Sequence, residues 1–259
     1  GRMGIYFLET GANQRASNVV YDRADSAISL VKKGDFKWKE LFAAADWFHI
    51  TGITPALSAS AAEASIEAAT MARQMGLTVS LDLNYRKKLW NYGKSAPQVM
   101  GELAKEADVI IANEEDIQNC LGMSLEGVDV TSGELDKEGY RALAERVKKQ
   151  YPSVKRLAIT LRESHSADSN GWSAALLGEE GFYLSKHYAI SNIVDRVGGG
   201  DSFASGLIYG LMTTGDPEKA VNCGAAHGAL AMTTPGDTSM ARLNEVESLM
   251  KDGGARVNR

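Results

Sequence analysis

Apolar and polar residues along most of this chain follow two alternating patterns, one typical of strands and one typical of helices. Short β-branched apolar runs recur, and each is followed by an alanine-rich stretch with apolar residues every three or four positions. The runs predict strands at 47–51, 78–83, 109–112, 156–160 and 174–177, and the stretches predict helices near 58–75, 95–105, 114–121 and 137–150. Repeated strand–helix units indicate a mostly parallel α/β sheet covered by helices, with ligands at the carboxyl ends of the strands.

The first residues follow a different pattern. Residues 4–8 (GIYFL) and 17–21 (SNVVY) are short β-prone runs separated by the loop-like segment 10–14, which predicts two strands joined by a loop. The sequence has no internal repeat, low-complexity segment or Pro-rich linker. We therefore expect one main domain.

Composition and charge narrow the classes of function. The 259 residues suffice for a sizeable core, and a formal net charge of -5 gives no electrostatic reason to expect a nucleic-acid partner. No apolar run approaches the ~18 residues of a membrane span, and the first residues lack the apolar core of a signal peptide. We expect a cytoplasmic protein without a membrane partner. Cys120, Cys223 and the four histidines lack metal-ligand spacing, which favours packing or surface roles.

The strongest chemical signal is segment 195–203 (DRVGGGDSF), which is followed by a helical stretch at 204–212. Three glycines, Gly198, Gly199 and Gly200, let backbone N–H groups approach an anion at a positively polarised helix N-terminus. Asp201 is then either an N-cap carboxylate or a base beside a bound phosphate, and spacing leaves both open. A dinucleotide-binding GxGxxG run would follow an early strand, and no Lys-Ser/Thr pair closes a P-loop, so neither is indicated.

The same segment resembles the motif D-T-x-G-A-G-D-x-F of the ribokinase-like (PfkB) carbohydrate kinases, with Arg196 at the usual Thr and Gly199 at the usual Ala. Further segments resemble the 2-keto-3-deoxygluconate kinases of this family, in the expected order and over nearly the whole chain. They are 51–54 (TGIT), 82–90 (DLNYRKKLW), 112–116 (ANEED), 160–164 (TLRES) and 233–237 (TTPGD).

The resemblance implies a ribokinase-like three-layer α/β/α fold with a mostly parallel sheet and a small β lid. Residues 1–24 would be part of the lid, and residues 25–259 would form the kinase core. Because these kinases begin with a βα segment that precedes the lid, we expect the amino-terminal portion of the family domain to be absent from this chain. Such lids often pair, so the resemblance also implies a homo-oligomer, a dimer through the lid.

The activity that the resemblance implies is phosphorylation of 2-keto-3-deoxygluconate to 2-keto-3-deoxy-6-phosphogluconate, with ATP and Mg²⁺ as cofactors. Asp201 would take the proton from the substrate hydroxyl, and the N–H groups of 198–201 would hold the developing charge. In the lid, Tyr6, Tyr21 and Arg23 would contact the sugar acid. Ile53 would line the sugar pocket.

Other residues would lie between the sugar acid and the nucleotide. Arg86 offers a planar fork to carboxylate or phosphate, although it could also be a surface residue in a basic cluster. Asn113 matches the first residue of the family's N-x-x-E motif, which orders Mg²⁺ through water, and Asp116 stands where Glu is usual. The resemblance places on the nucleotide side Asn84, Arg86, Asn113, Arg162, Ser164, Gly198 and Gly200. The small residues 224–226 could either join them or pack helices.

Two alternatives stay open at this stage. One is a kinase for a neutral ketose such as fructose, which would have little use for Arg23 and Arg86 together near a carboxylate. The other is a protein that binds nucleotide or sugar acid without catalysis, although such a protein needs no base at Asp201.

Overall fold

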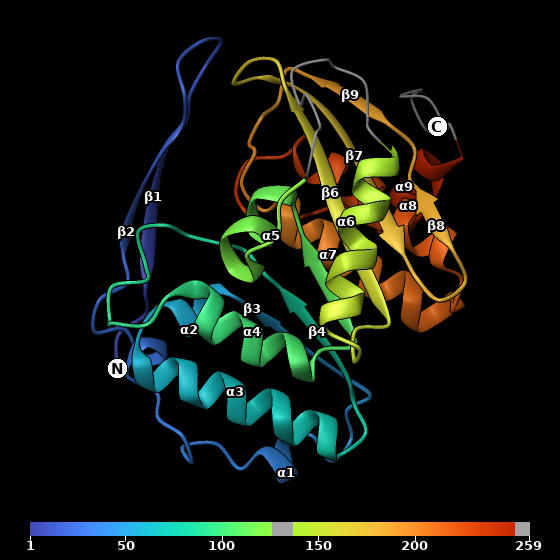
Figure 1. Ribbon diagram of the computed structural model, residues 1–259. Helices are drawn as coiled ribbons and strands as arrows, with labels where there is room; N and C mark the ends of the chain where they lie inside the picture. The colour runs from blue at the N-terminus through green and yellow to red at the C-terminus, as the bar shows by residue number, and fades with distance from the viewer. Residues whose placement is uncertain (126–136, 252–259) are drawn as a thin grey trace. The chain divides into compact units, whose positions relative to one another are not determined.

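The computed structural model of the protein describes residues 1–125 and 137–251. The chain divides into two compact units, the first made of Gly1–Leu8 with Val19–Ala158 and the second of Glu9–Asn18 with Ile159–Arg259. Figure 1 shows the elements of both. The predicted division at residue 24 into lid and core stays a prediction.

The first unit contains the parallel strands that the apolar runs predict. β3 (Trp47–Thr51), β4 (Thr78–Asp82) and β5 (Val109–Ala112) pair side by side in parallel, with Thr51 opposite Asp82 and Asp82 opposite Ile111. The carboxyl ends of the three strands therefore lie at one edge, from which three consecutive loops leave. These loops carry most of the polar residues that the sequence singles out in this unit.

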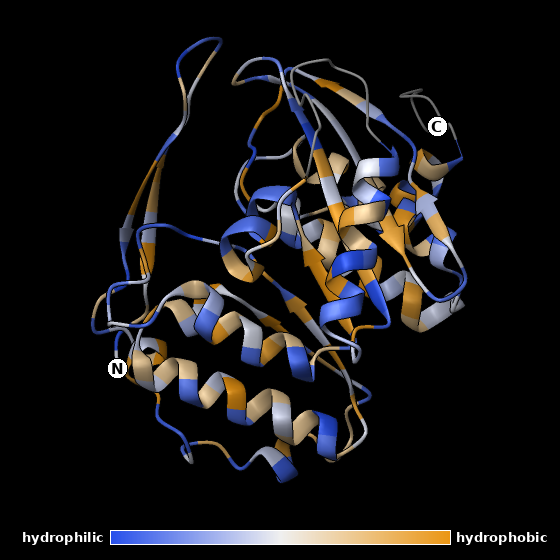
Figure 2. Cartoon of the chain, in the orientation of Figure 1, coloured by the Kyte–Doolittle hydropathy of each residue, from blue (hydrophilic) through white to orange (hydrophobic). Residues whose placement is uncertain are grey.

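Helices of the first unit cover the strands with small side chains. Along α3 (Ala59–Gln74), Ala61, Ala68 and Ala72 are at most 2% exposed, and the Ser58 hydroxyl caps the helix by accepting the Ala61 N–H at 3.1 Å. Figure 2 shows apolar residues concentrated along the strands of this unit, with polar ones alternating around the helices. The other helices are η1 (Ala27–Leu30), α1 (Trp38–Leu41), α2 (Ile53–Ala56), α4 (Ala96–Glu106), α5 (Glu114–Leu121) and α6 (Lys137–Gln150).

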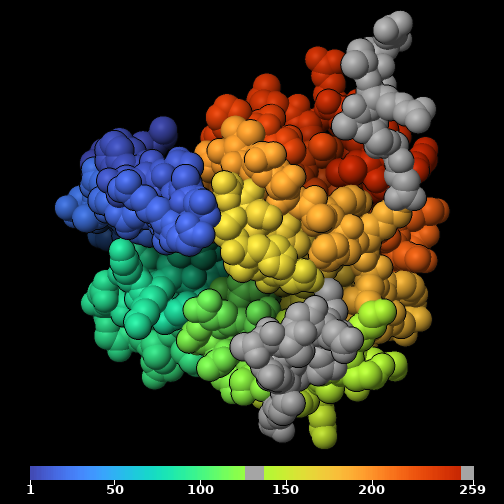
Figure 3. Space-filling view, turned by 90° about the horizontal axis from the view of Figure 1, so that it is seen from above, coloured from blue at the N-terminus to red at the C-terminus, as the bar shows by residue number. Residues whose placement is uncertain are grey.

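The two predicted N-terminal strands form a separate two-stranded ribbon of β1 (Ile5–Glu9) and β2 (Asn18–Asp22). Exposed and half-buried positions alternate along both strands, as the period of two requires. Ile5, Phe7 and Val20 are 48%, 60% and 53% exposed. The ribbon therefore presents large apolar side chains on its surface. It belongs to the N-terminal part of the chain, which is blue in Figure 3.

The second unit combines antiparallel strands with a helix pair. β7 (Ser169–Leu177) follows β6 (Arg156–Ser164) and pairs antiparallel with β8 (Phe182–Leu184) and β9 (Tyr188–Ser191). Helices α7 (Gly199–Thr214) and α8 (Pro217–Ala231) pack closely, and α9 (Leu243–Met250) follows them. A Cβ on Gly206 would lie 2.9 Å from the Cys223 carbonyl oxygen, and one on Gly210 only 2.6 Å from the Ala220 Cα. Glycine at these positions lets the two helix backbones approach.

The predicted strands and helices are all present, with some differences in extent. β6 and β7 are longer than predicted, and the helix after the glycines begins at Gly199 rather than at 204. The elements that were not predicted are η1, α1, α2, β8, β9, α8 and α9. In the parts of the chain that the structure describes, no helix is long and apolar enough to cross a membrane.

Candidate active site

The glycine run forms the start of α7. Gly198 is the N-cap with φ 79°, and a Cβ there would overlap the carbonyl group of Asp237, 2.8 Å from its carbon. A Cβ on Gly200 would meet no described atom within 4 Å. No side chain of the described residues caps this helix, so its first N–H groups remain available to an anion.

Asp201 lies in the first turn of α7 and is exposed. The interpretation of Asp201 as an N-cap is wrong, because Gly198 holds that position and Asp201 is the third helical residue. A carboxylate in the first turn is favoured by the helix dipole. Its exposure leaves it free to face a ligand at the same helix end.

Asp195 holds this segment in place, a role that the sequence did not reveal. Its Oδ1 accepts the Val197 N–H at 3.0 Å, and its Oδ2 accepts the Gly236 N–H at 3.1 Å. Next to it, Arg196 donates from Nη2 to Asn170 Oδ1 at 3.0 Å. The only sequence signal for Asp195 was its place at the start of the family motif.

Two of the residues predicted on the nucleotide side, Arg162 and Ser164, lie on β6. Arg162 and Ser164 are exposed and alternate with half-buried Glu163, so they share one face of the strand. The Arg162 guanidinium carbon lies 5.4 Å from the centre of the Trp172 ring, within cation–π range.

Of the two interpretations of residues 224–226, packing is supported, because all three are buried and a Cβ on Gly224 would lie 2.9 Å from a neighbouring carbonyl oxygen.

Two loops of the first unit come together around Asn84. This residue has φ 37°, a left-handed conformation that asparagine tolerates, and its Nδ2 donates to Thr51 Oγ1 at 3.0 Å. Gly52 N–H donates to Asp82 O at 2.7 Å, and a Cβ on Gly52 would overlap the next carbonyl group, that of Leu83. Ile53, half-buried, begins α2 directly afterwards.

Arg86 and Asp116 lie on the neighbouring part of this edge. Arg86 is half-buried and donates from Nη1 to the Tyr85 carbonyl oxygen at 2.8 Å. Asp116 is 8% exposed, and its two oxygens accept the N–H groups of Tyr85 at 2.9 Å and Asn113 at 3.3 Å. Burial raises the pKa of the Asp116 carboxyl, and these N–H donors and the charge of Arg86 oppose that rise.

The predicted metal role of Asn113 and Asp116 can be compared with these contacts. Both Asp116 oxygens are already engaged, and Asn113 Oδ1 accepts the Asp116 N–H at 2.7 Å. Nowhere in residues 1–125 and 137–251 do three or more His, Cys, Asp or Glu side chains form a group able to hold a metal ion. The donor set therefore does not form a protein-built cage for Mg²⁺.

The predicted lid residues form a cluster of their own. The rings of Tyr6 and Tyr21 have centroids 6.3 Å apart, and the Arg23 guanidinium carbon lies 4.6 Å from the Tyr21 ring centroid. All three side chains are half-buried. The structure thus brings together Tyr6, Tyr21 and Arg23 in the first unit, while Asp201 and its glycines belong to the second.

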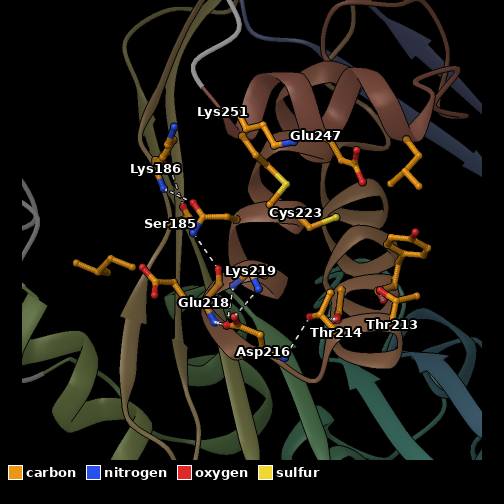
Figure 4. A pocket seen from close by; sticks show the side chains of 16 residues that line it. Ser185, Lys186, Thr213, Thr214, Asp216, Glu218, Lys219, Cys223, Glu247 and Lys251 are labelled. Carbon is orange, nitrogen blue, oxygen red and sulfur yellow. Dashed lines mark hydrogen bonds and ion pairs between the residues drawn. The ribbon is translucent and has the colours of Figure 1, made fainter.

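A cavity of about 710 Å³ occurs elsewhere in the second unit, between β8, α7, α8 and α9. Figure 4 shows its side chains, among them the ion pair of Lys219 with Asp216 at 3.2 Å. Burial raises the pKa of the Cys223 thiol in its wall, which lowers the fraction of reactive thiolate. None of the predicted site residues lines this cavity.

The profile of the pfkB family carbohydrate kinases matches residues 1–243. The chain belongs to this family. The predicted family, ribokinase-like fold and sugar-kinase class are therefore confirmed.

Similar proteins within the pfkB family carry related names. The crystal structure of 2-dehydro-3-deoxygluconokinase from Thermotoga maritima matches with a TM-score of 0.88 and 45% identity over 97% of this chain and 73% of that one. The 2-dehydro-3-deoxygalactonokinase of Haloferax volcanii is 30% identical over 100% of this chain and 73% of its own length. The 2-dehydro-3-deoxygluconokinase of Bacillus subtilis is 30% identical over 89% of this chain and 63% of its own length.

Proposed function

We propose that the protein transfers the γ-phosphoryl group of ATP to the terminal hydroxyl of 2-keto-3-deoxygluconate, giving the 6-phosphate. The observation that carries this proposal is the first turn of α7, where exposed Asp201 stands beside glycines whose N–H groups no described side chain caps. Relatives named 2-dehydro-3-deoxygluconokinase in Bacillus subtilis and Thermotoga maritima support the choice of sugar acid.

The chemistry requires a base and a place for negative charge. As the substrate oxygen bonds to the γ-phosphorus, an Asp201 oxygen takes its proton, and the bond from the γ-phosphorus to the β-bridging oxygen breaks to release ADP. N–H groups at residues 198–201 stabilise the charge on the transferring group, together with the helix dipole. Phosphoryl transfer depends mainly on such positioning and electrostatics, so a short list of residues is sufficient.

The acid end of the sugar needs different partners. Arg23 offers a guanidinium beside the rings of Tyr6 and Tyr21, which supply apolar faces and hydroxyl groups for the sugar chain. Arg86 supplies a second guanidinium, which we place between the sugar acid and the triphosphate. We place Asn84, Arg162 and Ser164 on the nucleotide side, and Ile53 beside the sugar.

Mg²⁺, when bound with ATP, neutralises charge on the β- and γ-phosphates. In such sites Mg²⁺ keeps several waters and needs only one or two protein carboxylates, so a protein cage is unnecessary. Asn113 Nδ2 has no partner among the described residues and can donate to a phosphate oxygen or an ordered water. Among the two predicted residues, Asn113 therefore fits a water-mediated contact better than Asp116.

Turnover measured by a coupled ADP assay tests the proposal, with 2-keto-3-deoxygluconate, its C4 epimer 2-keto-3-deoxygalactonate and fructose offered in parallel. We expect the first to have the highest kcat/KM. A preference for the epimer, which the Haloferax volcanii relative's name suggests, would change only the sugar acid. A preference for fructose would overturn the choice of an acid substrate.

Asp201→Asn separates a kinase from a binding protein. We expect the variant to lose turnover by about 10²-fold or more while ATP binding, measured by calorimetry, is retained. The matched control is Glu218→Gln, because Glu218 is the exposed first-turn carboxylate of the neighbouring helix α8. Equal losses in both variants would contradict the assignment of Asp201 as the base. No turnover in the unmodified protein would favour a binding protein without catalysis.

We also propose that the protein forms a homodimer through the exposed face of the β1–β2 ribbon. Ile5, Phe7 and Val20 place three large apolar side chains on this face, an arrangement that a second copy can cover. We propose a cytoplasmic location, where ATP is supplied.

A further inference from the structure

The loop that carries Arg86 is held at nearly every residue. After β4, the Leu83 N–H donates to Ile111 O at 2.9 Å, and the Cys120 thiol lies 3.8 Å from the Leu83 carbonyl oxygen. Asn84 follows with a left-handed φ of 37°, and its side chain donates to Thr51 Oγ1. Such a left-handed residue persists only where the surroundings fix it.

The last of these anchors is Asp116. Its Oδ2 and the Asn113 side chain form a capping box at the start of α5, which is a local helix-end contact. Its Oδ1 makes a contact outside the capping box. It accepts the Tyr85 N–H, which belongs to a loop 31 positions earlier in the chain. The carboxylate is 8% exposed, so water competes little for either bond.

The Arg86 side chain is held by Tyr85, the residue whose N–H Asp116 accepts. The Tyr85 carbonyl oxygen accepts the Arg86 Nη1 at 2.8 Å, so the orientation of Tyr85 fixes one end of the guanidinium. The remaining Arg86 donors make no hydrogen bond within the described part of the chain and can serve an anion. A carboxylate that fixes Tyr85 therefore also fixes the direction of Arg86.

We propose that Asp116 is a positioning residue that holds the Tyr85–Arg86 backbone so that the Arg86 guanidinium points at the anionic substrates, rather than a residue that orders Mg²⁺. This inference rests on the proposed kinase function for its kinetic consequence. Its structural part, the Tyr85 clamp, can be tested separately.

The test substitutes Asp116→Asn, which keeps the shape of the side chain but removes the charge and one acceptor. We expect kcat/KM to fall about tenfold or more, since hydrogen bonds to a charged group are the stronger kind. The matched control is Asp108→Asn. Asp108 is 7% exposed and its Oδ2 likewise accepts a backbone N–H, that of Val79 at 3.0 Å, but it has no link to Arg86.

A double-mutant cycle identifies the route of the effect. If Asp116 acts through Arg86, Asp116→Asn costs less than about twofold in an Arg86→Ala background, because the group to be positioned is gone. A loss of the same size in both backgrounds, together with a raised Mg²⁺ requirement, would overturn the proposal in favour of the metal role. Asp108→Asn should leave kcat/KM within about twofold in either background.

Amide hydrogen exchange provides a readout that needs no turnover. We expect the Tyr85 N–H to be protected in the unmodified protein and to exchange at least about tenfold faster in Asp116→Asn, with the Val79 N–H unchanged. In Asp108→Asn we expect the Val79 N–H to exchange faster and the Tyr85 N–H to be unchanged. An unprotected Tyr85 N–H would overturn the clamp whatever the activity, whereas a protected one without turnover on any of the three sugars would overturn only the kinase function.

Discussion

Alanine substitutions at Gly198 and Gly200 should have different effects. The substitution at Gly198 should lower the stability of the fold, and the one at Gly200 should lower catalytic activity. Gly198 has φ 79°, which costs an alanine roughly 1–2 kcal/mol. Its Cβ would also lie 2.8 Å from the Asp237 carbonyl carbon, far inside the ~3.5 Å of a normal carbon contact. Relieving such an overlap costs roughly 1–3 kcal/mol, so the total is about 3 kcal/mol. For a chain of this size that lowers Tm by roughly 6–12 °C.

Gly200→Ala should do the opposite. Its Cβ meets no described atom within 4 Å and the residue lies inside the helix, so alanine should stabilise the fold by up to about 1 kcal/mol. The same methyl group stands in the open space that we assign to a phosphate, and kcat/KM for ATP should fall at least about tenfold. Thermal unfolding and the coupled ADP assay, run on both variants, measure the two effects. A Gly200→Ala protein with full activity would refute the phosphate site, and an unchanged Tm in Gly198→Ala would refute the close approach to Asp237.

Three further predictions concern the substrate, the dimer and pH. Arg23→Ala should lower kcat/KM about tenfold for sugar acids and less than about twofold for fructose, and equal losses would count against a carboxylate contact. Phe7→Glu should convert a dimer into a monomer in sedimentation equilibrium, because it buries a charge in the proposed apolar face; an unchanged mass would exclude this interface. Burial lowers the pKa of His227 in the folded protein below its unfolded-state pKa of about 6.5. The neutral form of His227 therefore contributes its full stability above pH ~6.5, and this contribution is lost as the pH falls through the folded-state pKa. Urea unfolding at pH 7.5 and 5.5 should therefore show a larger loss for the unmodified protein than for His227→Gln, and equal losses would contradict this origin.

The elements that the sequence predicted best have sharp local signals at both ends. α5 begins and ends as predicted because Asn113 caps its start and Gly122, with φ 70°, ends it. By contrast, α8 was missed because small or apolar residues occupy nearly all of its faces, ten of them buried, and no polar face gave a helical period. β8 has only three residues, too few for a pattern of any period.

The candidate site divides in the same way. Gly198, Gly199, Gly200 and Asp201 are consecutive, so their combined chemistry is visible in the sequence. The extent of β7 was underestimated because residues such as Asn170 and Gly171 have low strand propensity, and only pairing with β9 reveals them as strand residues. Contacts that depend on pairing across the fold have no local signal.

Two aspartates show why the supporting part of the site was invisible. Asp195 joins the Val197 N–H to the Gly236 N–H, and Asp116 joins the Asn113 N–H to the Tyr85 N–H, so each carboxylate uses its two oxygens on two segments. In both cases one partner is near in sequence, which makes the residue look like an ordinary turn or cap, while the other is 41 or 31 positions away.

Each of these carboxylates also stands beside a segment with a proposed catalytic or binding group, the glycine run before Asp201 in one unit and the loop of Arg86 in the other. A carboxylate suits this task because it accepts from two directions at once and has no donor to satisfy. An asparagine would keep the shape but place an N–H group opposite one of the two backbone donors. The geometry of both loops therefore depends on the acid itself, so that either aspartate can limit activity without contacting a substrate.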